Sequence, residues 1–265
     1  MGSTIVVTSG KGGVGKTTTS ANIGTALAMA GKKICLVDAD IGLRNLDVLL
    51  GMENRVVFDL VDVIEKKCRL DRALVSDKRF KDRLFLLPAS QTKEKSAVTA
   101  GQFKALTVEL KNLFDYVIVD CPAGIEQGFR NAVAGADRAI VVTTPENTAV
   151  RDADRVVGLL AKAPILDPEL VINRLLPQMA ERGEMLAVDE IVQVLDIDLL
   201  GVVPDDETVI KGSNRGEPIV LNEKSLAGRA YRNIGRRILG DAVPLLSLNE
   251  TNGWLARMKK WFGMN

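Results

Sequence analysis

The sequence contains no histidine and only three cysteines among its 265 residues. The absence of histidine excludes acid–base catalysis and metal binding by imidazole. Cys35, Cys68 and Cys121 are scattered, odd in number and without C-x-x-C spacing. We therefore expect neither a disulfide framework nor a cysteine metal site, and a reducing cytosol is the simplest setting. Aromatic residues are also scarce, at 4%, yet both tryptophans, Trp254 and Trp261, lie near the C-terminal end.

Long apolar runs and an excess of one charge are missing as well. No segment approaches the roughly 18 apolar residues of a membrane-spanning helix, and no secretory signal pattern opens the chain. The formal net charge of +1 gives no reason at the level of the whole chain to expect nucleic acid as the main partner. We expect a cytoplasmic protein that is at most peripheral to a membrane.

Residues 1–242 alternate between short apolar segments and longer segments of helical period. The expected strands are 4–8, 33–37, 84–87, 116–119, 139–142, 170–172 and 199–203. The expected helices are 16–29, 99–112, 126–134, 147–161, 187–195 and 223–239. Strands that are apolar on both faces and separated by helices predict one α/β domain, with a mostly parallel sheet covered by helices on both faces.

A glycine-rich segment, GKGGVGKT (10–17), stands between the first expected strand and the first expected helix. Glycine allows backbone amides to turn toward phosphate oxygens, and the helix N-terminus adds a partial positive charge. The spacing G-x-x-x-x-G-K-[ST] predicts a P-loop NTPase domain that binds ATP. We expect Lys16 to contact the β- and γ-phosphates and Thr17 to bind Mg²⁺. The predicted nucleotide contacts in this loop are Gly10, Lys11, Gly12, Gly13, Val14, Gly15, Lys16, Thr17 and Thr18.

Three aspartates follow buried strands that should end at the same edge of the sheet. Asp120 ends the segment DYVIVD (115–120) and is predicted to be a second metal ligand. Asp40, in the segment VDAD (37–40), is the candidate that orients the attacking water or accepts its proton. Asp38 is expected to organise the metal site through Mg²⁺-bound waters or to pair with a lysine. Either of these last two acids could instead cap the next helix.

The loop contains a second lysine, Lys11, too early in the loop to share the position of Lys16. A cation there could serve its own nucleotide or point toward the phosphates of a partner, and the spacing does not decide between them. The pattern K-G-G-x-G-K-T-[ST] is the deviant Walker A motif, with which the chain resembles the MinD/ParA family of P-loop ATPases. Other matching segments are LVDADIGLRNLD (36–47), DYVIVDCPAG (115–124), TTPENTAVRDADR (143–155), VINR (171–174) and GVVPDDE (201–207).

This resemblance implies an ATP-dependent homodimer in which Lys11 crosses the interface and contacts the ATP of the partner subunit. Lys11 would then act as an arginine finger does in trans, a contribution of roughly 10³–10⁵ in rate where it has been measured for GTPases. The resemblance also implies that Asn173, Pro204 and Asp205 hold the adenine base. Residues 147–155 match the region where partner proteins of the family dock.

The last segment, 253–265, follows a plausible linker at 243–252 and differs from the rest of the chain. On a helical wheel, five apolar side chains fall within an arc of about 120° and three cations flank them. The apolar residues are Trp254, Leu255, Met258, Trp261 and Phe262, and the cations are Arg257, Lys259 and Lys260. This pattern is typical of a short helix that lies in an anionic membrane interface. The alternative is a terminal helix docked on the protein's own core or on a partner.

Within the family, the tail favours a membrane-associated ATPase that positions the cell-division site. The resemblance then implies recruitment of a MinC-like septum inhibitor to the inner face of the membrane when ATP is bound, and stimulation by a MinE-like activator. A ParA-type DNA-partition ATPase would need a basic surface stripe, and the net charge and the tail argue against it. A flagellar-number regulator of the FlhG/FleN type shares such a tail but usually begins with an activating extension. An iron–sulfur relative would need cluster cysteines that this chain lacks.

Overall fold

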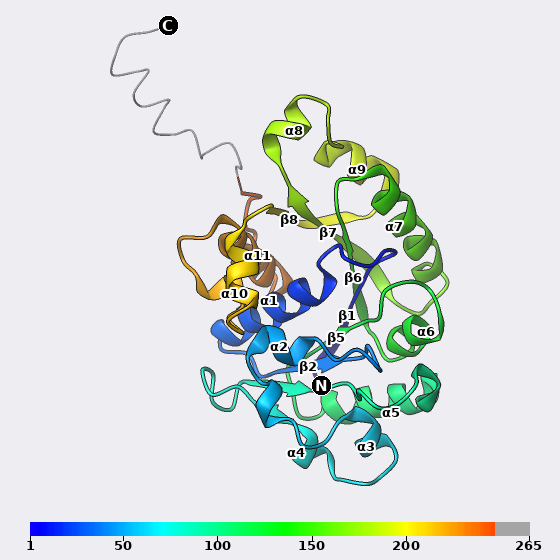
Figure 1. Cartoon of the computed structure of the whole chain (residues 1–265). Helices are drawn as coiled ribbons and strands as arrows, with labels where there is room; N and C mark the ends of the chain where they lie inside the picture. The colour runs from blue at the N-terminus through cyan, green and yellow to red at the C-terminus, as the bar shows by residue number, and fades with distance from the viewer. Residues whose placement is uncertain (247–265) are drawn as a thin grey trace, which may run out of the picture.

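A computed structural model describes residues 1–246 of the chain (Figure 1). The predicted amphipathic helix at 253–265, and residues 247–252 of the predicted linker, lie outside the described residues. Among residues 1–246, no helix is both long enough and apolar enough to cross a membrane.

Eight strands form one sheet in the order β3-β4-β2-β5-β1-β6-β7-β8. Their bounds are β1 Ser3–Thr8, β2 Ile34–Asp38, β3 Val75–Ser76, β4 Leu84–Leu87, β5 Tyr116–Asp120, β6 Arg138–Thr143, β7 Leu166–Leu175 and β8 Asp198–Pro204. Every neighbouring pair is parallel except β3 and β4, which are antiparallel. The predicted single α/β domain with a mostly parallel sheet is therefore confirmed.

Helices cover both faces of this sheet (Figure 1). One face carries α1 Lys16–Met29, α2 Leu46–Leu50, α10 Thr208–Ser213 and α11 Leu226–Ile238. The other carries α3 Leu60–Ile64, α4 Leu70–Ala73, α5 Ala100–Lys111, α6 Gln127–Ala134, α7 Asn147–Leu160 and α9 Val188–Leu195. The short α8, Pro177–Glu181, follows β7.

The two apolar clusters follow from the two-residue period of a strand. In β1, Val6 packs in the cluster on the α5–α7 face, whereas Ile5 and Val7 pack in the cluster beneath α1 and α11. All three side chains are 0% exposed. The central strands are therefore apolar on both faces, as the sequence predicted.

Helix α1 is buried along most of its length because α11 packs across it. A Cβ atom on Gly235 of α11 would lie 2.8 Å from the Cβ of Ala26 of α1, so glycine permits the close approach. The hydroxyls of Thr19 and Tyr231 are hydrogen-bonded at 3.1 Å between the same helices. This packing fixes α1, and its N-terminus faces the edge of the sheet where β1, β2 and β5 end.

Candidate functional site

The phosphate-binding loop connects β1 to α1 and depends on glycine at defined positions. Gly13 and Gly15 have φ angles of 80° and 92°, in the left-handed region that glycine adopts most easily. A Cβ atom on Gly15 would lie 2.2 Å from Nδ2 of Asn173. Gly15 is the N-cap residue of α1, and within residues 1–246 no side chain caps this end of the helix. Its first amides are thus directed toward the loop, where a phosphate group would be held.

Lys16 and Asp120 form a buried ion pair at the base of this loop. Lys16 Nζ lies 3.3 Å from Asp120 Oδ1, and the two residues are 7% and 1% exposed. Ser20 Oγ also donates to Asp120 Oδ1, at 3.0 Å. Burial by itself would lower the pKa of Lys16, but the charge and hydrogen bond of Asp120 raise it above its ordinary value. The ammonium group is therefore charged, and the structure brings together two of the residues predicted from the two motifs.

Asp38 is fixed by backbone amides. Its carboxylate accepts hydrogen bonds from Asp40 N at 3.0 Å, Asn45 N at 3.1 Å and Leu46 N at 3.2 Å. Burial, followed by the nearby charge of Asp120, raises the pKa of Asp38 to about 7. These contacts match the helix-cap alternative, because Asn45 and Leu46 open α2. No lysine pairs with Asp38 within residues 1–246, and its contact with Mg²⁺ stays a prediction.

Asp40 has a carboxylate oxygen that is buried without a partner. Its Oδ1 atom makes no hydrogen bond within the described part of the chain. The nearest cation is Lys95 Nζ at 3.8 Å, on a short 3₁₀ turn at Lys95–Ala97. The loop that carries Lys95 approaches the Asp40 segment, as Gly42 N donates to Ser90 O at 2.7 Å. An acceptor without a hydrogen bond can bind a water molecule, and the role of Asp40 toward the attacking water stays a prediction.

Lys11 lies apart from the Lys16–Asp120 pair and contacts the start of α7. Its Nζ atom lies 3.3 Å from Thr148 Oγ1 and 3.8 Å from Glu146 Oε2. The side chains of Lys11 and Glu146 are 45% and 60% exposed. An exposed pair of this kind contributes little to stability, so Lys11 is free to exchange it for another partner.

The region predicted to hold adenine is a cavity of about 470 Å³ beside the loop. Five predicted residues line it, namely Gly15, Thr18, Asn173, Pro204 and Asp205. The Asn173 side-chain amide donates to Val14 O at 2.8 Å and thereby braces the phosphate loop. Sequence reasoning missed Glu146, Arg174 and Tyr231, which also line the cavity. Glu146 and Arg174 carried a signal, because they lie in the matching segments 143–155 and 171–174, and the φ of 58° at Arg174 marks an irregular strand.

Fold and site together define a nucleotide-binding protein with a phosphate loop and a second, exposed lysine. The family model of the CobQ/CobB/MinD/ParA nucleotide binding domain matches residues 5–219. The septum site-determining protein MinD of Bacillus subtilis is 61% identical over 266 residues, which is 100% of this chain and 99% of that protein. The chain therefore belongs to the CobQ/CobB/MinD/ParA family and, within it, to the septum site-determining MinD proteins.

Solved structures agree with this assignment. A MinC:MinD cell division protein complex of Aquifex aeolicus superimposes with a TM-score of 0.86 at 47% identity, over 92% of this chain and 98% of that one. The septum site-determining protein MinD of Pyrococcus horikoshii, complexed with Mg-ADP, has a TM-score of 0.80 at 27% identity, over 92% of this chain and 100% of that one.

Proposed function

We propose that this chain is a Mg²⁺-dependent ATPase that dimerises with ATP and positions the cell-division site by recruiting a septum inhibitor to the membrane. The observation that carries the proposal is the separation of the two lysines of one loop. Lys16 is buried against Asp120, whereas Lys11 is exposed and contacts residues at the start of α7. This separation supports different roles, in which Lys16 would hold the nucleotide of its own subunit and Lys11 would reach a partner.

The residues around Asp120 fit a nucleotide-bound Mg²⁺ ion. Mg²⁺ in such sites binds one or two protein oxygens and completes its shell with phosphate and water. The Thr17 hydroxyl at the start of α1 and the Asp120 carboxylate at the end of β5 would supply these oxygens. When bound, the ion would neutralise charge on the phosphates. A Mg²⁺ ion bound in this way does not need three acidic ligands. Among residues 1–246, no group of three or more His, Cys, Asp or Glu side chains could hold a metal ion.

The remaining steps belong to the chain's own side chains. Lys16 exchanges Asp120 for the β- and γ-phosphates, and the Asp120 carboxylate becomes available to the metal. The Oδ1 atom of Asp40, which makes no hydrogen bond within residues 1–246, accepts a hydrogen bond from the attacking water and orients it. Lys11 leaves Thr148 and Glu146 and contacts the nucleotide of the partner subunit. Nucleotide binding and dimerisation would then occur as one event.

Membrane attachment and partner choice extend the proposal beyond the catalytic domain. The predicted helix at 253–265 would bind an anionic surface weakly alone, and two copies in one dimer would gain from effective concentration. The relative from Aquifex aeolicus forms a MinC:MinD complex, which supports a MinC-like inhibitor as the recruited protein. A MinE-like activator acting on residues 147–155 is the corresponding proposal for stimulated hydrolysis.

Vesicle co-sedimentation tests this function. The full chain should pellet with anionic vesicles in ATP but not in ADP, and removal of residues 253–265 should abolish pelleting. Phe262→Glu should act like the truncation, whereas Lys259→Glu should weaken binding less and in a salt-dependent way. A melting temperature that is unchanged by truncation excludes loss of a docked core helix. ATP-dependent binding of duplex DNA without vesicle binding would contradict the proposal in favour of a DNA-partition ATPase.

A further inference from the structure

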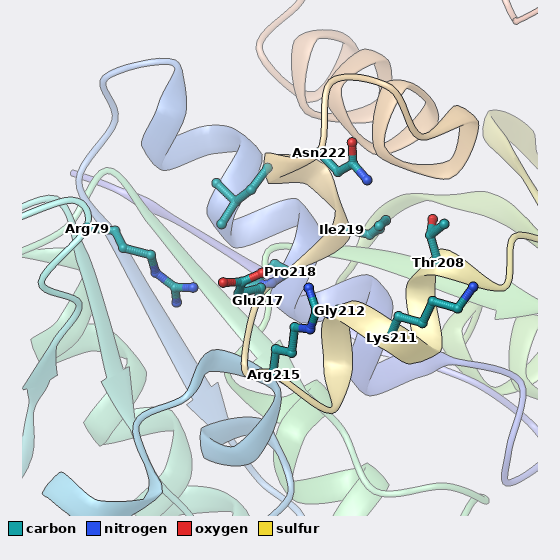
Figure 2. A pocket seen from close by; sticks show the side chains of 10 residues that line it. Arg79, Thr208, Lys211, Gly212, Arg215, Glu217, Pro218, Ile219 and Asn222 are labelled. Carbon is teal, nitrogen blue, oxygen red and sulfur yellow. The ribbon is translucent and has the colours of Figure 1, made fainter.

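A second cavity, of about 490 Å³, lies on the α1 and α11 face of the sheet. Its walls are the loop before β4, which carries Arg79, the helix α10, and residues 215–222. Figure 2 shows Arg79 on one side and Lys211 and Arg215 on the side of α10. None of the residues assigned to the nucleotide lines this cavity. It is therefore a separate site, which we call the α10 pocket.

Arg79 fixes one wall of the α10 pocket. Its guanidinium pairs with the Asp77 carboxylate at 2.6 Å and donates to Leu50 O at 2.8 Å and to Gly216 O at 3.0 Å. It therefore ties α2 to the segment after α10. One of the two N–H groups on Nη1 has no partner within residues 1–246, so Arg79 keeps one hydrogen-bond donor although Asp77 balances its charge.

Two glycines form the contact that Arg79 holds together. Gly51 and Gly216 have φ angles of 67° and 66°. A Cβ atom on Gly216 would lie 2.4 Å from the Cα of Gly51. The two backbones therefore approach as closely as glycine allows, and this wall is a rigid feature.

Lys211 and Arg215 supply cations that are available to a ligand. Within residues 1–246, Lys211 pairs only with Glu207, at 3.3 Å. The two side chains are 63% and 83% exposed, so a ligand can displace this contact. Arg215 is exposed and, within the described chain, its guanidinium makes no ion pair or hydrogen bond. The Asn222 amide and the Glu217 carboxylate also line the cavity. The unpaired Arg215, the displaceable Lys211, one N–H donor of Arg79, the amide and the acid suit a phosphate that carries hydroxyl groups.

We propose that the α10 pocket binds the phosphate of a glycerophosphate group, either in an anionic phospholipid headgroup or free in solution. Arg215 and Lys211 contact the phosphate, Arg79 donates its remaining N–H from the opposite wall, and Glu217 accepts hydrogen bonds from glycerol hydroxyls. The cavity volume accommodates one such group.

Two observations favour a lipid source over nucleic acid. Ile210, next to Lys211 on α10, is 67% exposed and lines the neighbouring nucleotide cavity, so an apolar side chain and a cation are adjacent on the surface of this helix. This combination suits a bilayer interface better than a duplex, whose phosphates favour cations alone. In addition, the last described residues return to this face, where Leu246 packs against the same apolar cluster as Val209 and Leu221. Binding of a lipid headgroup, which we call the lipid arm, rests on the proposed membrane association. Binding of free glycerol phosphate, the soluble arm, does not.

The first experiment measures the soluble arm. The full chain is saturated with Mg-ADP to occupy the phosphate loop and is titrated calorimetrically with glycerol 1-phosphate. Arg215→Glu should abolish the binding heat, and Lys162→Glu should retain it, because Lys162 follows α7 on the other face and carries the same charge change. Arg215→Gln is a second variant that removes the cation without reversing its charge. Its melting temperature should equal that of the original chain, which excludes misfolding as the cause of lost binding.

The second experiment measures the lipid arm with ATP and vesicles that contain phosphatidylglycerol. Arg215→Glu should weaken vesicle binding roughly tenfold relative to Lys162→Glu, because the local field near an anionic surface acts on each cation. Ile210→Ser should weaken vesicle binding but leave glycerol phosphate binding unchanged, and its ATP affinity is measured alongside because Ile210 also lines the nucleotide cavity. A full chain that binds no vesicles would contradict the proposed function while the calorimetry still tests the pocket.

The outcomes separate cleanly. Loss of either glycerol phosphate or vesicle binding in Arg215→Glu, with Lys162→Glu unaffected, supports the site and identifies its source. Equal behaviour of the two variants in both assays overturns the proposal. Loss of duplex DNA binding alone in Arg215→Glu overturns it too, because the pocket would then belong to a nucleic-acid surface.

Discussion

The two ends of the phosphate loop differ in how their lysines are held. At the α1 end, the Lys16 side chain is 8% exposed and paired to an aspartate that is itself 1% exposed. At the β1 end, the Lys11 side chain is 45% exposed, and its Nζ atom lies 3.3 Å from Thr148 Oγ1 and 3.8 Å from Glu146 Oε2. A buried charge must be exchanged for another charge, whereas an exposed one can leave its partner at little cost. The buried end is therefore suited to hold a ligand, and the exposed end to change partners.

The strongest way to break this comparison is Lys16→Ala. The substitution removes at least two charge-assisted contacts to phosphate, each worth about 1.5–3 kcal/mol, so ATP affinity should fall by roughly 10²-fold or more. A fluorescent-nucleotide titration measures this loss. The control is the melting temperature, because Asp120 loses its buried partner. ATP binding near the original affinity would show that Lys16 is not the phosphate contact.

Lys11→Ala should instead separate binding from dimerisation. ATP affinity should stay within about threefold, because the lost contacts are exposed and weak. The ATP-dependent dimer should disappear from size-exclusion chromatography, and partner-stimulated hydrolysis should fall by up to about 10³-fold, as for a missing finger in trans. Thr148→Ala is the matched control, since it removes the resting contact of Lys11 but leaves the lysine. A normal ATP dimer from Lys11→Ala would refute the trans role.

Local sequence patterns predicted the secondary structure only in part. The order of strands and helices followed from apolar segments such as 116–119 and from glycine and lysine spacing in one loop. Among residues 1–246, five helices of four to six residues, such as α2 and α10, are too short to show a helical period. Strand β7 begins earlier than predicted. Asp167, Pro168 and Glu169 interrupt its apolar pattern, so the sequence did not show this part of the strand.

Contacts between distant segments could not be predicted from the sequence. Lys11 and Glu146 are far apart in the chain; Glu146 lies in the matching segment 143–155 but had no role assigned, and Lys95 belongs to no motif. They meet the site because loops at the ends of β4 and β6 reach the same edge of the sheet as the phosphate loop. The roles of Asn173, Pro204 and Asp205 came only from family resemblance, although the structure places all three on one cavity. The amphipathic tail rests on sequence alone.

The buried acids make the nucleotide-free chain sensitive to pH. Asp38 has a pKa of about 7 when folded, above its ordinary value of 3.8. The folded state therefore holds the proton more tightly, and this stabilisation is full below pH 4 and is lost as pH rises through about 7. In chelator and without nucleotide, the free energy of unfolding should fall by about 1 kcal/mol between pH 6 and pH 8. Asp38→Asn should flatten that slope in urea titrations, and an unchanged slope would assign the effect to Asp120.

The smallest expected effect concerns Lys95, which lies 3.8 Å from Asp40. We expect Lys95 to position the Asp40 carboxylate for the attacking water, through a pair whose side chains are 47% and 18% exposed. Lys95→Gln should lower kcat about two- to fivefold and leave the KM for ATP unchanged, because the contact is half-exposed and acts after nucleotide binding. Lys95→Arg should restore the rate.

Lys93→Gln is the matched control, because Lys93 lies two residues away and bonds to Glu65 at 3.2 Å instead. A double-mutant cycle completes the test. Asp40→Ala should leave an ATP-bound dimer with little hydrolysis, and Lys95→Gln should add nothing to it, since two residues acting through one contact are not additive. An equal loss of rate from Lys95→Gln with and without Asp40 would mean that the lysine acts elsewhere. An equal loss from Lys93→Gln would reduce the effect to general surface charge.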